Sequence, residues 1–359
     1  MSCSSAAASS PKRTRAPSKP LASRRSSAPA PTRRTSSSSS TNTSRSKDVD
    51  DLVERFLNGE RRALARVISR VENETPEGRE YLRALFPHSG KAHTIGITGG
   101  AGSGKSTLTG ALAAEYRRRG HTVGIVAVDP SSPFSHGAIL GDRIRMQDLA
   151  LDPGVYVRSM ASRGALGGLA PTIDDVVSVM DAFGFDYVLI ETVGAGQDEV
   201  EVAGTALTTI LVNNPGTGDD IQALKAGIIE IADILVVNKA DHPGADILVS
   251  QLQALLSLAP AGSRRPVIVK TTAIKGEGLD KLADAVAEHR QYLESSGQLA
   301  EQRSQDARHQ VLAIARAILL ERIRRGTPEE QLAALVDQVA NRQLDPHTAA
   351  EALAAAVTA

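Results

Sequence analysis

Three separated segments of the chain carry residues whose types and spacing could bind and cleave a nucleoside triphosphate. One is the glycine-rich stretch 99–106, and the other two begin at Glu191 and at Asn238. Each directly follows a short apolar run of the kind that forms a buried parallel strand. The three segments are therefore predicted to line one pocket, with a phosphate-binding loop, a carboxylate able to sense a γ-phosphate and side chains that identify the base.

The glycine-rich segment has the spacing of a P-loop. Its glycines leave room for backbone N–H groups to converge on phosphate oxygens at the start of a helix. Lys105 is predicted to bridge the β- and γ-phosphates, and the Ser106 hydroxyl to ligate Mg²⁺. A ligand-free glycine turn is the competing interpretation, and the full spacing disfavours it. The predicted nucleotide contacts of this segment are Gly99, Gly100, Ala101, Gly102, Ser103, Gly104, Lys105, Ser106 and Thr107.

The segment Asn238-Lys239-Ala240-Asp241 predicts that the base is guanine. The Asp241 carboxylate would accept hydrogen bonds from the ring N–H and exocyclic amine, and the Asn238 amide would support the ring and neighbouring loops. Adenine offers the wrong edge, and a buried carboxylate left unpaired is costly. Thr272 and Ala273, after the last predicted strand, fit a loop whose backbone contacts the guanine oxygen. Alone, the segment could be a helix cap or a turn; after a P-loop it predicts GTP and GDP as ligands.

Acidic residues at strand ends supply candidate metal ligands. Glu191 ends an apolar strand and is followed by Gly194, whose N–H could contact the γ-phosphate. Asp129 ends the second predicted strand, and Asp142 follows in a loop rich in Ser, Gly and Pro. Both aspartates could instead cap helices or turns. We expect Asp129, Asp142 and Glu191 to join Ser106 in the Mg²⁺ and water network.

Hydrolysis needs a positioned water and a cation near the developing charge, and the sequence offers only candidates. Gln197 could orient the water. Lys225, Arg143, Arg145 and Arg163 are candidate cations, although a surface or partner contact is the favoured interpretation for each. Because no arginine finger is evident, we expect slow intrinsic turnover that a partner stimulates.

The charge of the chain is unevenly distributed. Residues 1–47 hold ten of the 41 Lys and Arg and no acid, which leaves 31 basic against 41 acidic residues and a body of about −10. An acidic body argues against nucleic acid as the main partner. The only cysteine is Cys3, so neither an internal disulfide nor a thiolate metal site is expected in the folded part. No apolar stretch is long enough to predict a membrane span.

The first 47 residues are predicted to form a disordered tail. Leu21 is their only large aliphatic residue, five prolines interrupt them, and residues 36–40 are all serine, so an amphipathic targeting helix is not expected. The basic, serine-rich composition keeps a mitochondrial transit peptide, or a weak tether to an acidic partner, as alternatives. The expected location is the cytoplasm, with the mitochondrial matrix as the alternative.

The order of apolar runs predicts an α/β fold, a doubly wound and mostly parallel sheet of the P-loop GTPase kind with helical extensions at both ends. Helical periodicity predicts a hairpin over 50–88, interrupted near Asn58 and Gly59. The predicted parts are the tail 1–47, an N-terminal helical extension 48–92, the GTPase domain 93–290 and a C-terminal helical dimerisation extension 291–359. The predicted strands are 94–98, 123–128, 187–190, 209–212, 234–237 and 267–269.

An apolar stripe on the predicted helix 307–325 is more pronounced than a solvated helix needs. Packing onto the domain is one explanation. Formation of a homodimer is the other, since this helix follows an already complete α/β core. The stripe comprises Val311, Leu312, Ala315, Ile318, Leu319 and Ile323, with Ile314 beside them.

These motifs, in this order, resemble the MeaB/ArgK GTPases, a family that includes the methylmalonic aciduria type A protein. The resemblance runs from about residue 50 to the end of the chain and leaves out only the tail. The chain departs from the family pattern at Asn213, Asn214, Thr217 and Asp220, and these departures concern the choice of partner more than nucleotide binding. The motifs that carry it are 127–132, 139–146, 166–168, 191–197 and 236–241.

The resemblance implies a GTP-binding and GTP-hydrolysing chaperone of adenosylcobalamin-dependent acyl-CoA mutases, chiefly methylmalonyl-CoA mutase. It implies a homodimer formed through the C-terminal helices, and GTP use that gates cofactor loading and protects or reactivates the mutase. Within a mobile loop over 215–225, it places Lys225 at the position linked to partner-stimulated hydrolysis. A kinase of an amino-acid transport system would need an acceptor pocket and a base, and a metal-insertion GTPase would need Cys and His ligands; the sequence has no motif for either.

Overall fold

The computed structural model describes residues 38–130, 149, 151–162, 170–192, 206–216, 231–258 and 264–358. The chain divides into two units, residues 1–45 and residues 46–359. Every contact described below lies within the second unit.

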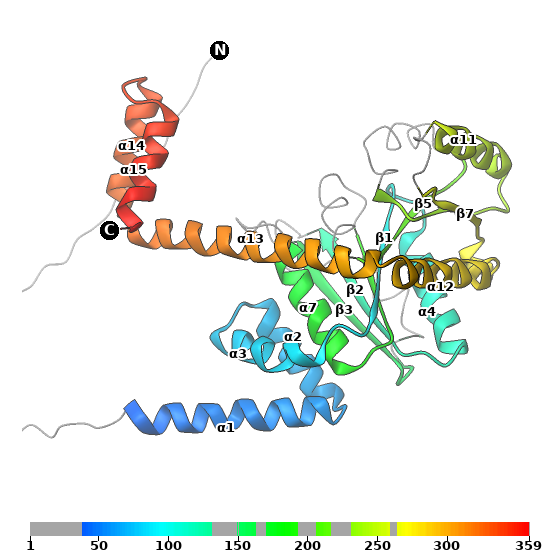
Figure 1. Cartoon of the computed structure of the whole chain (residues 1–359), viewed down its shortest axis with the longest axis horizontal. Coiled ribbons are helices and arrows are strands. Elements are labelled where there is room, and N and C mark those ends of the chain that lie inside the picture. Colours follow the sequence, from blue (N-terminus) through cyan, green and yellow to red (C-terminus); the bar gives the residue numbers. More distant parts are fainter. Residues whose placement is uncertain are drawn as a thin grey trace, which may run out of the picture. The chain divides into compact units, whose positions relative to one another are not determined.

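A seven-stranded parallel sheet organises the described part of this unit (Figure 1). Strands rich in Val and Ile and buried on both faces favour parallel pairing with helical crossovers, and each neighbouring pair is parallel. The spatial order is β3-β2-β4-β1-β5-β6-β7, which confirms the predicted α/β class. The strands are β1 (His93–Thr98), β2 (Val123–Pro130), β3 (Val155–Ser162), β4 (Tyr187–Glu191), β5 (Thr208–Asn213), β6 (Ile234–Val237) and β7 (Val267–Lys270).

The order of the strands changes direction at β1. Strands β2, β3 and β4 lie on one side of β1, and β5, β6 and β7 lie on the other side. In register, Ile97 of β1 lies opposite Glu191 of β4 and Ile210 of β5, so the carboxyl ends of these three strands meet. Ligands of open parallel sheets bind outside the carboxyl ends of the strands at such a switch point.

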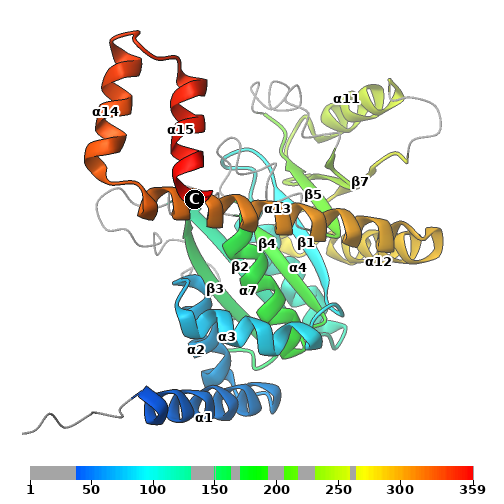
Figure 2. The same ribbon diagram turned by 60° about the vertical axis from the view of Figure 1, so that its left-hand side comes forward.

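Helices cover both faces of the sheet (Figure 2). On β4, Tyr187 and Leu189 belong to the apolar cluster with α4 and α12. Val188 and Ile190 belong to the cluster with α2 (Arg61–Glu72), α3 (Pro76–Leu85) and α7. This alternation is the period of two of a strand, and it gives the predicted doubly wound arrangement. The helices that flank the sheet after β1 are α4 (Lys105–Arg118), α7 (Ala170–Phe183), α11 (Ala245–Ser257) and α12 (Leu279–Ser296).

The edge strand β3 is absent from the strands predicted from sequence. Val155 and Met160 are buried, but the four residues at 156–159 are only partly buried. Arg158 takes such a position and forms an ion pair with Glu72 of α2. An edge strand has one sheet neighbour and tolerates polar side chains, so a criterion based on continuous apolar runs misses it.

The N-terminal helices are α1 (Ser38–Leu57), α2 (Arg61–Glu72) and α3 (Pro76–Leu85), followed by the short turn η1 (Phe86–His88). The predicted interruption near Asn58 is confirmed, because Gly59 follows the end of α1 with φ 81°. The predicted hairpin is thus three helices. Helix α1 begins earlier than the periodicity at Asp48 indicates; serine lowers helix stability only slightly, and a nucleated helix propagates at little cost.

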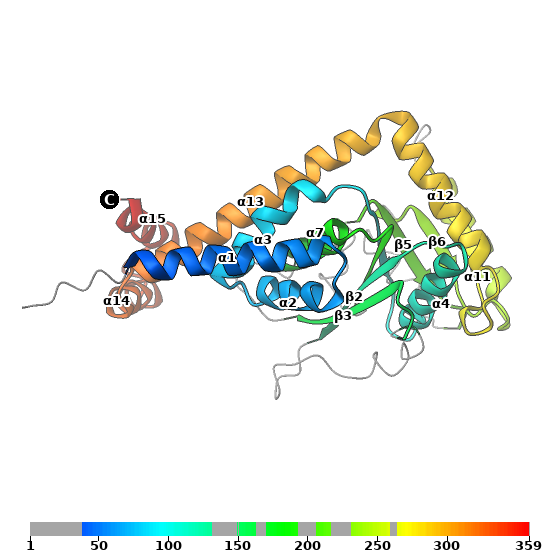
Figure 3. The ribbon, with the colours of Figure 1, turned by 90° about the horizontal axis from the view of Figure 1, so that it is seen from below.

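The C-terminal helices are α13 (Gln298–Gly326), α14 (Glu329–Ala340) and α15 (Pro346–Thr358). Gly297, with φ 76°, separates α12 from α13 at the bend visible in Figure 3. Polar contacts fix the first turns of α13: Gln302 donates to the carbonyl of Ala206, and Arg303 to that of Gly90.

The apolar stripe of α13 stays exposed in the single chain. Val311, Leu312 and Leu319 are each more than half exposed, and α13 has no buried residue. Packing onto the domain therefore does not account for the stripe. No helix in the described ranges has both the length and the apolar run that a bilayer crossing requires.

Candidate nucleotide site

The P-loop leaves β1 and enters α4 through glycines that other residues could not replace. At Gly99, φ is 142° and a Cβ would lie 2.2 Å from the carbonyl oxygen of Val212 on β5. At Gly104, φ is 95° and a Cβ would lie 2.4 Å from Nδ2 of Asn238. Helix α4 then begins at Lys105 with no side-chain cap. Its first N–H groups and the positive end of its dipole are available to phosphate oxygens.

Lys105 is held against the loop that precedes it. Its ammonium donates to the carbonyls of Gly99 at 2.6 Å and Gly100 at 3.1 Å, and the residue is buried. A compact ammonium in this place can act as a point charge on a phosphate.

Ser106 and Glu191 come together as the sequence predicts for a metal site. The Ser106 hydroxyl on the first turn of α4 donates to a carboxylate oxygen of Glu191, the last residue of β4, and Glu191 is buried. A hydroxyl and a carboxylate side by side supply the oxygen ligands that Mg²⁺ takes alongside substrate phosphates. Among the described residues no cluster of three His, Cys, Asp or Glu could hold a metal ion.

The remaining predicted metal and catalytic residues are described only in part. Asp129 lies on β2, where it is paired in register with Ala161 of β3. It is two residues beyond Ala127, which is paired with Glu191 of β4. The side chain of Asp129 is outside the described part of the chain. Its role stays a prediction. The other candidates that fall outside the described residues are Asp142, Arg143, Arg145, Arg163, Gly194, Gln197 and Lys225.

Asn238, which follows β6, joins three loops of the site. Its amide nitrogen donates to the carbonyl of Ser103 at 3.0 Å, and its amide oxygen accepts from the Thr271 hydroxyl and the Ala273 N–H, each at 3.2 Å. The residue is 2 % exposed. The buried amide thus fixes the P-loop against the loop after β7. Sequence reasoning anticipated Thr272 and Ala273 but missed Thr271.

Lys239 adds a second link from the same segment. Its ammonium donates to the carbonyl of Gly102 at 3.0 Å, and its backbone has φ 54°. The segments at 99–106 and 238–241 are therefore in direct contact, as one pocket requires.

Asp241 differs from the expectation of a buried carboxylate. Its side chain is 33 % exposed and lies 2.8 Å from the ammonium of Lys275. This hydrogen bond lowers the pKa of the Asp241 carboxyl below its usual value. The ligand-free protein therefore pays no penalty for a buried, unpaired acid. Lys275 is not among the residues predicted from the sequence, where its only signal is its place in the short loop after Thr272, just before Gly276.

The comparisons with known proteins agree with this geometry. The family model described as "Methylmalonyl Co-A mutase-associated GTPase MeaB" matches residues 64–328. This chain belongs to the MeaB family of GTPases. Its enzymatic activity is accordingly the hydrolysis of GTP.

Relatives of this MeaB-family chain come from distant organisms. A putative GTPase of Pyrococcus abyssi is 45% identical over 84% of this chain and 95% of its own length. The GTPase ArgK of Escherichia coli is 34% identical over 71% of this chain and 80% of its own. The mouse methylmalonic aciduria type A homolog, mitochondrial, is 32% identical over 85% of this chain and 78% of its own length. A crystal structure titled LAO/AO transport system kinase has a TM-score of 0.67 and 25% identity, covering 87% of this chain and 98% of its own.

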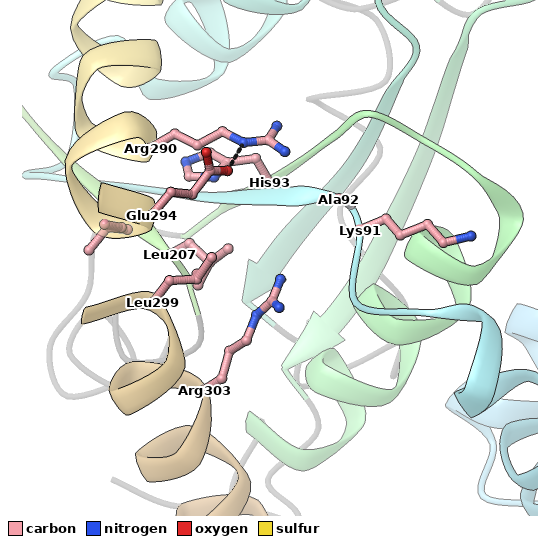
Figure 4. A pocket seen from close by; sticks show the side chains of 9 residues that line it. Lys91, Ala92, His93, Leu207, Arg290, Glu294, Leu299 and Arg303 are labelled. Carbon is pink, nitrogen blue, oxygen red and sulfur yellow. Dashed lines mark hydrogen bonds and ion pairs between the residues drawn. The ribbon is translucent and has the colours of Figure 1, made fainter. Parts of the chain in front are cut away.

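A pocket of the MeaB-family chain at the opposite end of β1 lies apart from the nucleotide site (Figure 4). It contains His93, the first residue of β1. Burial of this side chain lowers its pKa to about 3. His93 shares a hydrogen bond with the hydroxyl of Thr208, which bonds to His289 of α12, and His289 contacts Asp233. This chain of bonds links β1, β5 and α12. The pocket is lined by Lys91, Ala92, His93, Leu207, Arg290, Leu293, Glu294, Leu299 and Arg303.

Proposed function

We propose that this chain is a GTP-driven chaperone that gates cofactor loading of an adenosylcobalamin-dependent acyl-CoA mutase and protects or reactivates it, with methylmalonyl-CoA mutase as the expected client. One observation supports the proposal: hydrogen bonds join Ser106 to Glu191 and Asn238 to Ser103, so the three predicted nucleotide segments meet, in a chain whose residues 64–328 match the mutase-associated family model. The name of the mouse relative points to the same metabolism.

The proposed chemistry combines residues that the structure brings together with others that are predicted from the sequence alone. Lys105 would place its charge on the β- and γ-phosphates, and Ser106 with Glu191 would hold Mg²⁺, joined by Asp129 and Asp142. Bound Mg²⁺ would neutralise charge on the phosphates. Gln197 would orient the attacking water. These assignments of role are part of the proposal.

Guanine selection is assigned to the segment after β6. Asp241 would accept from the two donors on the guanine edge, while Asn238 keeps the loops in place. Lys239 lies against Gly102 on the phosphate side. Thr272 and Ala273, both buried, are proposed to face the guanine oxygen. Their N–H groups bond to the Glu277 carbonyl and to the Asn238 amide oxygen, so a contact with the base requires one of these bonds to be exchanged.

The exposed stripe on α13 supports a homodimer as the working form. Large apolar side chains on one helix that stay exposed in the single chain mark a protein interface. A second copy of the same helix would cover them with a matching apolar surface.

Phosphate release in the presence and absence of a mutase tests the proposal. The protein is mixed with GTP and Mg²⁺, with or without a cobalamin-dependent acyl-CoA mutase, and the assay is repeated with ATP. We expect slow release from GTP, a clear increase with the mutase, and little release from ATP.

Two outcomes would separate the parts of the proposal. If the mutase leaves the rate unchanged, the chaperone assignment is wrong and the GTPase remains. If Asp241→Asn does not shift the preference away from guanine, the assignment of the base contact is wrong.

A further inference from the structure

The loop after β7 presents one cation to the carboxylate proposed to identify the base. Lys275 ends the short turn η2 (Ala273–Lys275), and its ammonium lies 2.8 Å from Oδ2 of Asp241. The loop is closed by backbone bonds from the Thr272 N–H to the Glu277 carbonyl at 3.0 Å and from the Lys275 N–H to the Thr272 carbonyl at 2.8 Å. Gly276 follows with φ 73°. Lys275 therefore projects from a turn of fixed shape.

The contact matters because of what guanine recognition asks of Asp241. The carboxylate must be ionised and oriented, since a protonated acid accepts fewer hydrogen bonds. Asp241 is partly exposed, so without a partner it would sample several rotamers and lose that freedom when the base binds. A carboxylate has about four acceptor positions. Two donors from guanine leave room for the ammonium, so the ion pair can persist in the complex.

We propose that Lys275 is a positioning residue for guanine recognition, which holds the Asp241 carboxylate oriented before the nucleotide arrives. This inference rests on the proposed contact between Asp241 and the base. Lys275 itself need not touch the nucleotide.

A matched control exists at the end of the same strand. Lys270 of β7 forms an ion pair with Asp246 of α11 at 2.9 Å, and its side chain is about as exposed as that of Lys275, at 50% against 53%. Neither Lys270 nor Asp246 belongs to the predicted base loops. Loss of a surface lysine as such can therefore be separated from loss of the contact with Asp241.

The test measures the dissociation constant of GDP by fluorescence or calorimetry for wild type, Lys275→Ala, Lys275→Arg and Lys270→Ala. A partly exposed ion pair predicts an increase of about two- to fivefold for Lys275→Ala. Lys275→Arg should restore near wild-type affinity, and Lys270→Ala should leave it unchanged.

Two readouts separate positioning from a general structural effect. In an Asp241→Asn background, Lys275→Ala should add less than about 1.5-fold, because the partner through which it acts is gone. Lowering the pH should weaken GDP binding at a higher pH in Lys275→Ala than in wild type, since the pKa of Asp241 is no longer lowered. Thermal unfolding shows whether each variant is folded.

Provided that wild type prefers GDP to ADP, two results would overturn the inference. One is tighter GDP binding by Lys275→Ala, and the other is an equal loss of affinity from Lys275→Ala in the wild-type and Asp241→Asn backgrounds. If wild type does not prefer GDP to ADP, the proposed contact between Asp241 and the base is itself wrong. The two failures are therefore distinguishable.

Discussion

At the scale of single residues, Asn238 shows how one buried amide can join loops that are far apart in sequence. It bonds to Ser103 of the P-loop and to Thr271 and Ala273 after β7. Because all of its amide bonds are internal and the residue is buried, removing it leaves several polar groups without a partner. Such losses cost more than a surface hydrogen bond.

We therefore predict that Asn238→Ala lowers the free energy of unfolding by about 2–3 kcal/mol and weakens nucleotide binding. Urea denaturation and GDP titration measure the two effects. Asn341→Ala, at the exposed end of α14, is the control and should change stability by less than about 0.5 kcal/mol. Equal losses in the two variants would contradict the role given to the Asn238 amide.

At Gly99 the neighbouring backbone leaves no room for a side chain. We predict that Gly99→Ala abolishes nucleotide binding, because its Cβ would lie 2.2 Å from the Val212 carbonyl and force the P-loop or β5 to move. Gly120→Ala shares a positive φ, 88°, but meets no atom within 4 Å, and should cost only about 1 kcal/mol of stability. Calorimetric titration of both variants checks this, and normal binding by Gly99→Ala would refute it.

The sequence predicts these residues unequally, and the reason is physical. A P-loop is prescribed by local spacing, so Gly99 to Ser106 can be identified without a fold. Thr271 and Lys275 act only because β6 and β7 are neighbours, and no local pattern marks them. The burial of Asp241 was overestimated because its partner, Lys275, comes from that neighbouring loop.

At the scale of elements, the strands with continuous apolar runs could be predicted and the edge strand β3 could not. Central strands are buried on both faces and carry a strong signal. On β3 the partly buried positions include Arg158, which pairs with a helix. Tertiary contact thus replaces the local pattern on which strand prediction depends.

The hydrogen-bonded chain through His93, Thr208 and His289 connects β1, β5 and α12, and it predicts a pH dependence. Burial lowers the pKa of His93 to about 3 from an ordinary value of 6.5. Between these values the unfolded chain binds a proton that the folded chain refuses, so stability falls as the pH drops, by up to about 1.4 kcal/mol per pH unit. Burial raises the pKa of Asp233 to about 6. Its contribution has the opposite sign, because it lowers the stability of the folded chain as the pH rises.

The contribution of His93 is isolated by His93→Gln, which keeps a hydrogen-bonding side chain toward Thr208 and does not titrate. Between pH 7.5 and pH 5.5, wild type should lose about 1.4 kcal/mol more stability than this variant. Urea unfolding at both pH values measures the difference, with exposed His88→Gln as control. If the difference in unfolding free energy between wild type and His93→Gln is the same at both pH values, the prediction is wrong.

At the scale of the whole molecule, the α/β core and the C-terminal helices differ in how they use apolar surface. The core buries its strands under helices on both faces. Helix α13 buries none of its residues. The sequence predicts the stripe but leaves two explanations open, because periodicity shows that a face is apolar and not what covers it.

The proposed homodimer gives a prediction at this scale. Ile318→Glu on α13 should convert the dimer to monomers, since a charge would be buried in an apolar interface. Ile247→Glu on α11, where the side chain is also exposed, should leave the dimer intact. Light scattering coupled to size-exclusion chromatography measures the mass. A wild-type monomer, or a dimeric Ile318→Glu, would exclude α13 as the interface.

The carboxyl ends of β1, β4, β6 and β7 are proposed to form one site for a guanine nucleotide. Calorimetric titration of the chain with a non-hydrolysable GTP analogue and Mg²⁺, compared with the matching ATP analogue, is the decisive experiment. We expect one site per chain and an affinity for the GTP analogue at least about 100-fold higher than for the ATP analogue. No heat of binding, or equal affinity for the two analogues, would contradict it.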